Sequence, residues 1–135
     1  MNQNNNLGQA PWILVVDDDH GTRGPVESYL RVRGGYQVDT AKTLAEARAR
    51  LASGRLYAVA VLDTNLPDGC GYDLVKNTDE GMNLREYNSP IRPVLVAVSE
   101  VEGNQVHWKG IPFLHKGVGL GTRVVQTIDS LLDRK

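Results

Sequence analysis

Hydrophobic residues form three short uninterrupted runs along the chain, at residues 12–16, 58–62 and 94–98. Each run is rich in valine or alanine and is bounded by polar or turn-forming residues. Continuous apolar runs of this length are typical of strands buried on both faces, as in a parallel sheet. Two weaker segments, at 36–40 and 113–115, have the composition of further strands. The pattern therefore predicts a sheet of about five strands.

Segments with helical spacing lie between these strands. Apolar positions three and four residues apart predict a helix that ends at Gly34, with Pro25 in its first turn. A second helix is predicted after Thr43, because Glu46 stands three residues later, as in a capping box. The apolar stripe of residues 124–132 predicts a third helix. Strands that alternate with helices indicate an α/β domain with a parallel sheet.

The chain of 135 residues has the length of one domain. Residues 1–10 are polar and rich in asparagine, so we expect a disordered tail there and a single domain over residues 11–135. The longest apolar runs have about five residues, whereas a membrane-spanning helix needs roughly 20. The single cysteine, Cys70, cannot form an internal disulfide, which suits a cytoplasmic protein.

Charge adds a further exclusion. Lysine and arginine number 15 against 16 aspartates and glutamates, which leaves a formal net charge of −1. The basic residues are scattered, with no stripe of the kind that nucleic-acid binding needs. We therefore expect no direct nucleic-acid partner and no membrane partner.

Chemically active side chains follow four of the five predicted strands. In chain order they are Asp17, Asp18 and Asp19, then Asp63, then Ser99 and Glu100, and finally Lys116. Because parallel strands end at the same edge of a sheet, we expect these groups to share one crevice. Aspartates at strand ends often only cap helices or shape turns. Their joint occurrence with a lysine and a hydroxyl group is what favours a functional site.

Crowded carboxylates need a cation. Two unit charges about 4 Å apart repel by roughly 4 kcal/mol at an effective dielectric constant near 20. Such a group either takes up protons or binds a cation, and Mg²⁺ prefers carboxylate and phosphate oxygens. An aspartate beside Mg²⁺ can attack phosphorus to form an aspartyl-phosphate. A strand-end lysine and hydroxyl group would hold the phosphoryl oxygens.

Two segments carry a family resemblance. ILVVDDDHGTR (residues 13–23) and VLDTNLPDGCGYDL (residues 61–74) resemble motifs of two-component response-regulator receiver domains, which are similar to the chemotaxis response regulator. The resemblance extends over residues 12–133. It implies a flavodoxin-like fold with three layers and a doubly wound parallel sheet of strand order 2-1-3-4-5. It also implies that Asp63 is the phosphoacceptor and that the phosphohistidine of a sensor kinase is the donor.

The resemblance further implies roles for individual residues. By this resemblance, Mg²⁺ would be bound by the side chains of Asp17, Asp18 and Asp63 and by the backbone carbonyl of Asn65. Pro67 and Gly69 shape the loop beneath that carbonyl. Lys116 and Ser99 complete the phosphorylation site, and the Ser99 hydroxyl moves toward the phosphoryl group. Phe113 stands where an aromatic switch residue is expected, although it could equally be a core phenylalanine.

Three features depart from the family pattern. Glu100 places a carboxylate where the family favours a small residue, which would repel a phosphoryl group. Gly117 replaces the proline that follows the lysine, so we expect the loop to take a different path without a cis peptide bond. The interval from Ser99 to Lys116 is short, so we expect the fourth helix to be short or missing.

The leading functional hypothesis is a receiver domain whose Mg²⁺-dependent phosphorylation at Asp63 switches its partner contacts. Its partners would be a sensor histidine kinase or a phosphotransfer protein and a downstream protein, and a homodimer is compatible with it. We expect no enzymatic activity beyond its own phosphorylation and dephosphorylation. An alternative is a receiver-like module that binds its partner without phosphorylation. A third hypothesis is a phosphatase with an aspartate nucleophile, but Asn65 stands where its general acid would be needed.

Overall fold

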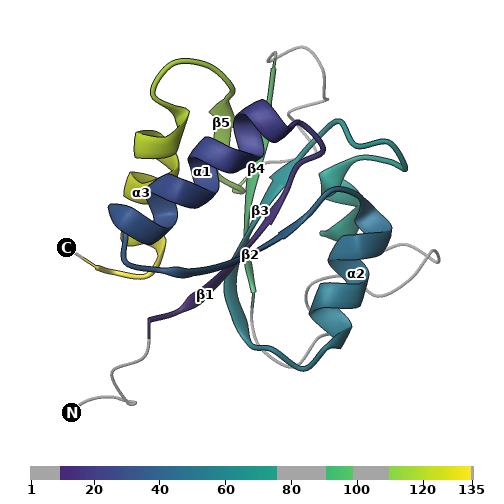
Figure 1. The fold of residues 1–135 in the computed structure, drawn as a ribbon, viewed down its shortest axis with the longest axis horizontal. Helices are drawn as coiled ribbons and strands as arrows, with labels where there is room; N and C mark the ends of the chain where they lie inside the picture. The colour runs from purple at the N-terminus through teal and green to yellow at the C-terminus, as the bar shows by residue number, and fades with distance from the viewer. Residues whose placement is uncertain (1–9, 76–90, 99–109, 135) are drawn as a thin grey trace.

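The computed structural model describes residues 10–75, 91–98 and 110–134. Five strands form one parallel sheet in the order β2-β1-β3-β4-β5 (Figure 1). The strands are β1 (Trp12–Val16), β2 (Gln37–Ala41), β3 (Tyr57–Asp63), β4 (Arg92–Ala97) and β5 (Phe113–His115). The predicted fold class and strand order are therefore confirmed, and the boundaries of every predicted strand are matched within two residues.

Helices cover both faces of the sheet. They are α1 (His20–Val32), α2 (Leu44–Ala52), the 3-10 helix η1 (Gly71–Leu74) and α3 (Leu120–Leu131). Helices α1 and α3 lie together on one face, and α2 lies on the other (Figure 1). The described residues thus form the three layers expected of a doubly wound α/β domain.

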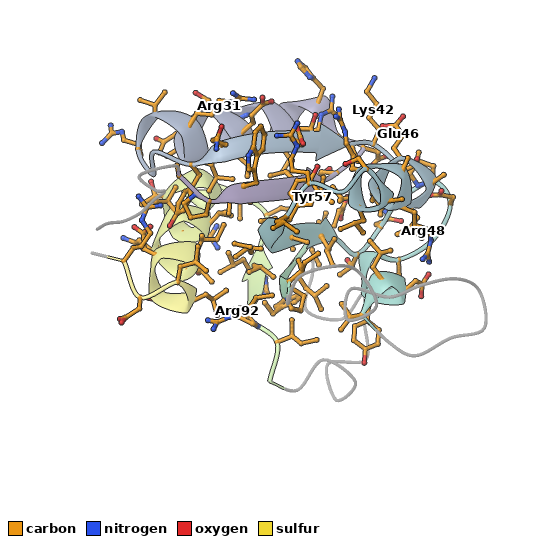
Figure 2. The ribbon with its side chains drawn as sticks, turned by 90° about the horizontal axis from the view of Figure 1, so that it is seen from below. Arg31, Lys42, Glu46, Arg48, Tyr57 and Arg92 are labelled. Atoms are coloured by element: carbon orange, nitrogen blue, oxygen red, sulfur yellow. The ribbon has the colours of Figure 1, made fainter. Side chains whose placement is uncertain are left out.

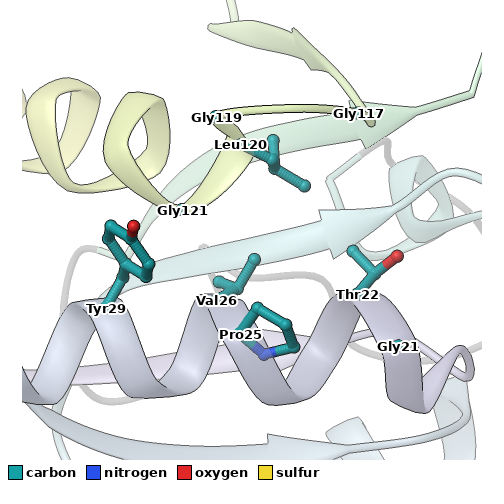
Figure 3. Close-up of a pocket in the computed structure, with 9 residues that line it drawn as sticks. All are labelled: Gly21, Thr22, Pro25, Val26, Tyr29, Gly117, Gly119, Leu120 and Gly121. Carbon is teal, nitrogen blue, oxygen red and sulfur yellow. The ribbon is translucent and has the colours of Figure 1, made fainter.

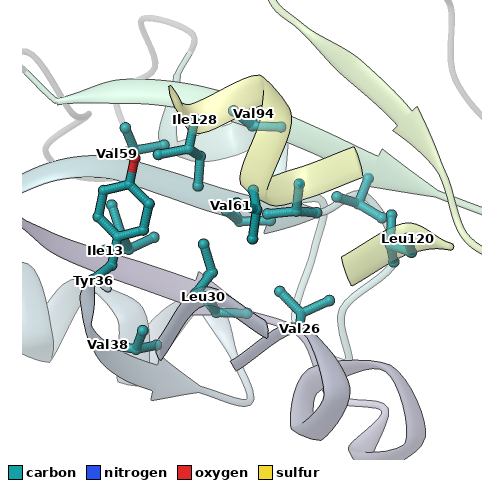
Figure 4. Packing of buried hydrophobic residues seen from close by; sticks show 14 residues of the cluster. Ile13, Val26, Leu30, Tyr36, Val38, Val59, Val61, Val94, Leu120 and Ile128 are labelled. Atoms are coloured by element: carbon teal, nitrogen blue, oxygen red, sulfur yellow. The ribbon is translucent and has the colours of Figure 1, made fainter. Parts of the chain in front are cut away.

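The central strands contribute to two separate hydrophobic cores, because successive side chains point to opposite faces of a sheet. Ile13 of β1, labelled in Figure 4, packs against α1 and α3 in the first core. Val15 belongs to the same core. Leu14 and Val16 pack against α2 in the second core. All four side chains are at most 2% exposed. Burial on both faces explains why these strands have no polar alternation in the sequence.

Helix α1 begins earlier than the sequence pattern predicts. Asp19 caps it by accepting a hydrogen bond from the backbone N–H of Gly21 at 3.0 Å. Pro25 therefore lies inside the helix and not in its first turn, so that prediction is wrong. Glycine and proline are weak helix formers, so the start of α1 depends on the Asp19 cap, and α1 as a whole packs against α3. The helix ends before Gly34, as predicted.

Two arginines contact the outer side of the edge strand β2. The backbone carbonyls of β2 point alternately toward β1 and away from it. The Ala41 carbonyl points toward β1, because it accepts a hydrogen bond from the Asp17 N–H. The carbonyls of Val38 and Thr40 face the opposite side. Arg31 of α1, labelled in Figure 2, donates to the Val38 carbonyl at 2.8 Å, and Arg50 of α2 donates to the Thr40 carbonyl at 3.2 Å.

Several predictions fall outside the described residues. The predicted tail of residues 1–10 is one of them, because only Ala10 is described. The Ala10 carbonyl accepts a hydrogen bond from the Gln37 side chain at 2.9 Å. The prediction of a short or missing fourth helix concerns residues 101–110, of which only Gly110 is described. Within the described ranges, no helix has the length and apolar character needed to cross a membrane.

Candidate functional site

Three predicted aspartates meet at the carboxyl edge of the sheet. Asp17 follows β1 and Asp63 ends β3, and since these strands are neighbours their carboxylates come together. One carboxylate oxygen each from Asp17, Asp18 and Asp63 lies within 4.8 Å of the others. Asp17 and Asp63 are only 4% and 2% exposed, whereas Asp18 is exposed to solvent. The strand topology therefore creates a buried acidic pair with a third carboxylate at its mouth.

Lys116 brings a positive charge to this pair. Its ammonium Nζ lies 3.1 Å from Asp63 Oδ2 and 3.2 Å from Asp17 Oδ2. The lysine side chain is 14% exposed, so all three groups are largely removed from water. A buried ion pair is stable only when good geometry compensates for the lost hydration. One ammonium facing two carboxylates leaves the site with a net negative charge.

This arrangement shifts the pKa values of the buried groups. Burial, together with the nearby Asp17 charge, raises the pKa of Asp63 to about 6, although Asn65 and Lys116 act in the opposite direction. Burial alone would lower the pKa of Lys116, but the Asp17 and Asp63 charges outweigh it and raise that pKa. At neutral pH the site therefore holds an ionised Asp63 beside a protonated lysine.

The loop after β1 is fixed by its own polar groups. Asp17 Oδ1 accepts a hydrogen bond from the Asp19 N–H at 2.8 Å. Arg23 of α1 donates to the Asp17 carbonyl at 2.8 Å, so the helix holds the loop from the other side. The Asp19 side chain caps α1 and also accepts from the Thr22 hydroxyl at 2.9 Å. Asp19 is thus a helix cap, while Asp17 and Asp18 belong to the acidic site.

The loop after β3 places Asn65 beside the acidic pair. The Asn65 N–H donates to Asp63 Oδ1 at 3.1 Å. The next four residues form a tight turn in which Leu66 and Gly69 exchange two backbone hydrogen bonds, at 2.9 and 3.3 Å. Leu66 is buried and Asn65 is exposed. The turn therefore anchors one end of the loop in the core and leaves Asn65 at the site.

Gly71 is a positioning residue of the site that the sequence pattern did not reveal. A Cβ atom added there would lie 2.4 Å from the Asp63 carbonyl oxygen and 2.7 Å from Leu62 Cβ. No rotation of a side chain relieves a clash with backbone, so η1 reaches the end of β3 only because this residue is glycine. The second glycine of the Gly-Cys-Gly sequence was the available signal.

We expect Gly71→Ala to lower the free energy of unfolding by about 2 kcal/mol, because the added methyl group forces η1 away from β3. Urea titration of the two proteins measures this difference. Gly24→Ala is the matched control, since Gly24 lies within α1 and a Cβ there meets only His20 Cε1, at 3.9 Å. An equal loss in both variants would contradict the close-contact mechanism.

Lys116 is held by the loop between β5 and α3. Its N–H donates to the Ala97 carbonyl at 2.8 Å, which continues the pairing of β5 with β4. Gly117 follows with a φ of +141°, a conformation that proline cannot adopt. The described residues contain no cis peptide bond. The expected absence of a cis bond after Lys116 is therefore confirmed.

Helices α1 and α3 approach each other closely behind this loop. A Cβ at Gly121 would lie 2.7 Å from the Tyr29 ring, so the contact requires glycine. A cavity of about 370 Å³ opens between the two helices (Figure 3). It is lined by Gly21, Thr22, Pro25, Val26, Tyr29, Gly117, Gly119, Leu120 and Gly121. The lining contains no acidic or basic side chain, so the acidic chemistry lies beside the cavity and not within it.

The donor set fits a hard divalent cation. Mg²⁺ binds oxygen ligands at about 2.0–2.1 Å, which places opposite ligands about 4 Å apart. Carboxylate oxygens within 4.8 Å of one another need only small side-chain adjustments to reach this geometry. The site carries two buried carboxylates against one ammonium, and a cation would balance the excess charge. The carboxylates of Asp17, Asp18 and Asp63 are the ligands that this cluster offers to such an ion.

The remaining predicted site residues divide into two groups. Ser99 and Glu100 lie outside the described residues. Phe113 is half-buried and packs against the core on the α2 side of the sheet. Its ring meets that of His115 edge-on, with centroids 5.2 Å apart. This position is compatible both with a switch residue and with a core phenylalanine, so the role of Phe113 stays a prediction.

Sequence comparison places most of the chain in a known family. The family model described as "Response regulator receiver domain" matches residues 13–102. The photosynthetic apparatus regulatory protein RegA of Rhodovulum sulfidophilum is 38% identical over 74 residues, which cover 55% of this chain and 39% of that protein. The two-component response regulator ORR5 of Oryza sativa subsp. japonica is 29% identical over 93 residues, which cover 69% of this chain and 65% of that protein. This chain thus spans less than half of RegA.

Solved receiver structures have the same fold. The response regulator TrrA of Thermotoga maritima, crystallised with Mg²⁺ and BeF, aligns with a TM-score of 0.71 at 22% identity, covering 90% of this chain and 98% of that one. A complex of histidine kinase ThkA with TrrA aligns with a TM-score of 0.70 at 24% identity and the same coverage. The CheY-like receiver domain of Methanospirillum hungatei covers 93% of this chain and 95% of its own, with a TM-score of 0.68 and 22% identity.

Three observations agree on the family. The strand order is the one implied by the motif resemblance. The two motif segments bring Asp17, Asp18 and Asp63 together, and Lys116 joins them from the last strand. The family model covers two-thirds of the sequence. The chain therefore belongs to the response regulator receiver domain family of two-component signalling systems.

Proposed function

We propose that this receiver domain accepts a phosphoryl group on Asp63 in an Mg²⁺-dependent reaction, and that the modification switches its contacts with a partner protein. The observation that carries the proposal is the buried Asp63 carboxylate, held 3.1 Å from the Lys116 ammonium and beside Asp17 and Asp18. A carboxylate that served only to cap a helix would need neither the lysine nor the second buried aspartate.

Asp63 has the protonation state that a nucleophile needs. Its pKa of about 6 leaves the carboxylate ionised at neutral pH. A carboxylate oxygen attacks phosphorus, the bond from phosphorus to the donor imidazole nitrogen breaks, and that nitrogen keeps the electron pair. The product is an aspartyl-phosphate. Lys116, already bonded to Asp63 Oδ2, is placed to donate to a phosphoryl oxygen.

The metal would be held by the side chains of Asp17, Asp18 and Asp63 and by the backbone carbonyl of Asn65. Bound Mg²⁺ supplies positive charge that offsets the negative charge developing on the phosphoryl oxygens. Arg23 keeps the Asp17 backbone in place during this reaction, because it bonds the Asp17 carbonyl from α1. The tight turn from Leu66 to Gly69 likewise keeps the backbone of the preceding residue, Asn65, in place.

The phosphoryl donor would be a sensor histidine kinase or a phosphotransfer protein. The kinase complex of the structurally similar TrrA supports the first of these. We also propose a cytoplasmic location, a domain over residues 11–135 after a tail of residues 1–10, and no activity beyond its own phosphorylation and dephosphorylation. The output would be a contact with a downstream protein or a second copy of the chain, and neither nucleic acid nor membrane would be bound directly. Ser99 and Phe113 would carry the switch.

Beryllofluoride, a mimic of the phosphoryl group, tests the proposal. We expect Mg²⁺ with beryllofluoride to raise the midpoint of thermal unfolding of the wild-type protein by several degrees, because both ligands bind only the folded state. Mg²⁺ alone should give a smaller rise. Differential scanning calorimetry at fixed protein concentration provides the measurement.

Asp63→Asn is the matched variant for this experiment. It keeps the size and shape of the side chain but cannot carry the phosphoryl mimic, so the additional shift from beryllofluoride should disappear. Equal unfolding midpoints for the wild-type protein with and without both ligands would contradict phosphorylation. That result would favour a receiver-like module that binds its partner without modification.

A further inference from the structure

A carboxylate from the loop after β3 caps a helix that precedes β3 in the chain. Asp68 Oδ1 accepts a hydrogen bond from the Leu44 N–H at 2.8 Å, and Asp68 Oδ2 accepts one from the Ala45 N–H at 3.1 Å. Leu44 and Ala45 are the first two residues of α2. These bonds join parts of the chain that are 24 and 23 residues apart, so the contact is tertiary and not a local turn.

Helix α2 also has a cap of its own. The Thr43 hydroxyl accepts from the Glu46 N–H at 3.0 Å, and the Glu46 side chain reaches back to the Lys42 N–H at 2.9 Å. The first N–H groups of a helix have no partner within the helix. Asp68 accepts from the first two N–H groups, those of Leu44 and Ala45, and Thr43 accepts from the third, that of Glu46. The two caps therefore act on one helix end but connect it to different parts of the molecule.

Asp68 belongs to the same tight turn that fixes Asn65. The turn is closed by the two backbone hydrogen bonds between Leu66 and Gly69. On its α2 side it has little free space, because a Cβ at Gly69 would lie 2.7 Å from Leu44 Cδ1. The Leu44 and Leu66 side chains are both 6% exposed and share one core. A displacement of the turn would therefore break the Asp68 bonds to α2.

The geometry points to Asp68 as a positioning residue of the phosphoacceptor site: by clamping the turn to the N-terminus of α2, it holds Asn65 at the distance from Asp63 that metal binding requires. This inference rests on the proposed function, since it concerns the same metal site. The backbone N–H of Leu44 lowers the pKa of Asp68, so the clamp stays charged at neutral pH. The positive end of the α2 dipole adds to the attraction.

The contact between Asp68 and α2 and the binding of the cation must strengthen each other. If Asp68 favours the loop conformation that binds the cation, the cation must strengthen the bonds of Asp68 to α2 to the same extent. The amide protons of Leu44 and Ala45 then report on metal binding from outside the metal site. We expect their exchange with solvent to slow when Mg²⁺ binds.

The decisive experiment compares Asp68→Ala with Thr43→Ala. Each removes a side-chain cap from the same end of α2, but only Asp68→Ala separates the helix from the loop. We expect Asp68→Ala to weaken Mg²⁺ binding about tenfold, as loss of a supporting partner of a metal ligand does. Thr43→Ala should change it less than about twofold. Isothermal titration calorimetry with MgCl₂ measures both, and unfolding in urea shows whether the variants are folded.

Nuclear magnetic resonance of the metal-free proteins adds a readout that does not depend on Mg²⁺. The Asn65 and Gly69 amide signals should move in Asp68→Ala and stay in place in Thr43→Ala. Asp68→Asn keeps one acceptor oxygen and should bind Mg²⁺ with intermediate affinity. Equal Mg²⁺ affinity of Asp68→Ala and the wild-type protein, or equal weakening in both alanine variants, would overturn the positioning role. A wild-type protein that binds no Mg²⁺ would instead overturn the proposed function.

Discussion

Replacing Asp63 with asparagine is expected to make the metal-free protein more stable at neutral pH, by about 2 kcal/mol. The wild-type carboxylate is 2% exposed, and burial raises its pKa from 3.8 to about 6. A shift of that size corresponds to about 3 kcal/mol of unfavourable free energy for the ionised form at pH 7. An uncharged amide of the same shape avoids most of this cost, although its NH₂ group replaces one of the two oxygens that accept from Asn65 and Lys116. The residue that we propose to carry the phosphoryl group is thus a residue that lowers stability.

The pH dependence should differ between the two proteins in a defined direction. Between about pH 4 and pH 6 the folded state holds a proton on Asp63 that the unfolded state has released. The wild-type protein should therefore lose stability from this group as the pH rises through that window. In Asp63→Asn this contribution is absent. Urea unfolding at about pH 4.5 and pH 7 in the presence of a chelator gives both free energies.

Asp133→Asn provides the control for this comparison, since Asp133 is an exposed carboxylate in the turn that follows α3 and its φ of 56° suits asparagine. It should leave stability within about 0.5 kcal/mol of the wild-type value, as surface substitutions usually do. A loss of stability in Asp63→Asn at pH 7 would mean that Lys116 more than compensates for the burial of Asp63. The electrostatic description of the site would then be wrong.

Replacing Lys116 with methionine should have the opposite effect. Methionine keeps most of the length of the side chain but leaves the Asp17 and Asp63 carboxylates facing each other without a cation. Removing one member of a buried ion pair typically costs about 3–5 kcal/mol. We therefore expect a loss of about 3 kcal/mol at pH 7 in the absence of metal. Urea unfolding under those conditions measures it.

Two treatments should restore stability to Lys116→Met. Lowering the pH protonates one of the two carboxylates, and Mg²⁺ at millimolar concentration supplies the missing positive charge. Lys42→Met is the control, because Lys42 is an exposed lysine and should tolerate the change. If Mg²⁺ stabilises Lys116→Met no more than it stabilises the wild-type protein, the cation does not bind between these carboxylates.

The sequence predicted the sheet well because its strands are buried on both faces. Ile13 to Val16 have no polar residue among them, and all four are fully covered by the two helical layers. The strand order came from the motif resemblance and not from periodicity. Once the strands are parallel and adjacent, the meeting of Asp17 and Asp63 follows from topology alone. The predicted cluster of these two residues with Asp18 and Lys116 is confirmed by their distances.

The features that the sequence pattern did not predict depend on contacts between distant residues. The start of α1 was missed because the segment around Gly21 and Pro25 has weak intrinsic helix propensity, and the packing of α1 as a whole against α3 is invisible in a local window. The Asp68 cap was missed because a capping rule considers neighbours in sequence, whereas this cap comes from 24 residues away. The need for glycine at position 71 arises from the path of another element, the end of β3.

The two arginines on the edge strand have a consequence for assembly. An exposed strand edge is a template on which another chain can add a strand, and this is a common route to aggregation. Arg31 and Arg50 occupy the two outward carbonyls of β2, so an incoming strand would have to displace both. The sheet cannot be extended at β2 without that loss. At the β2 edge an approaching chain therefore meets two arginine side chains in place of open backbone carbonyls.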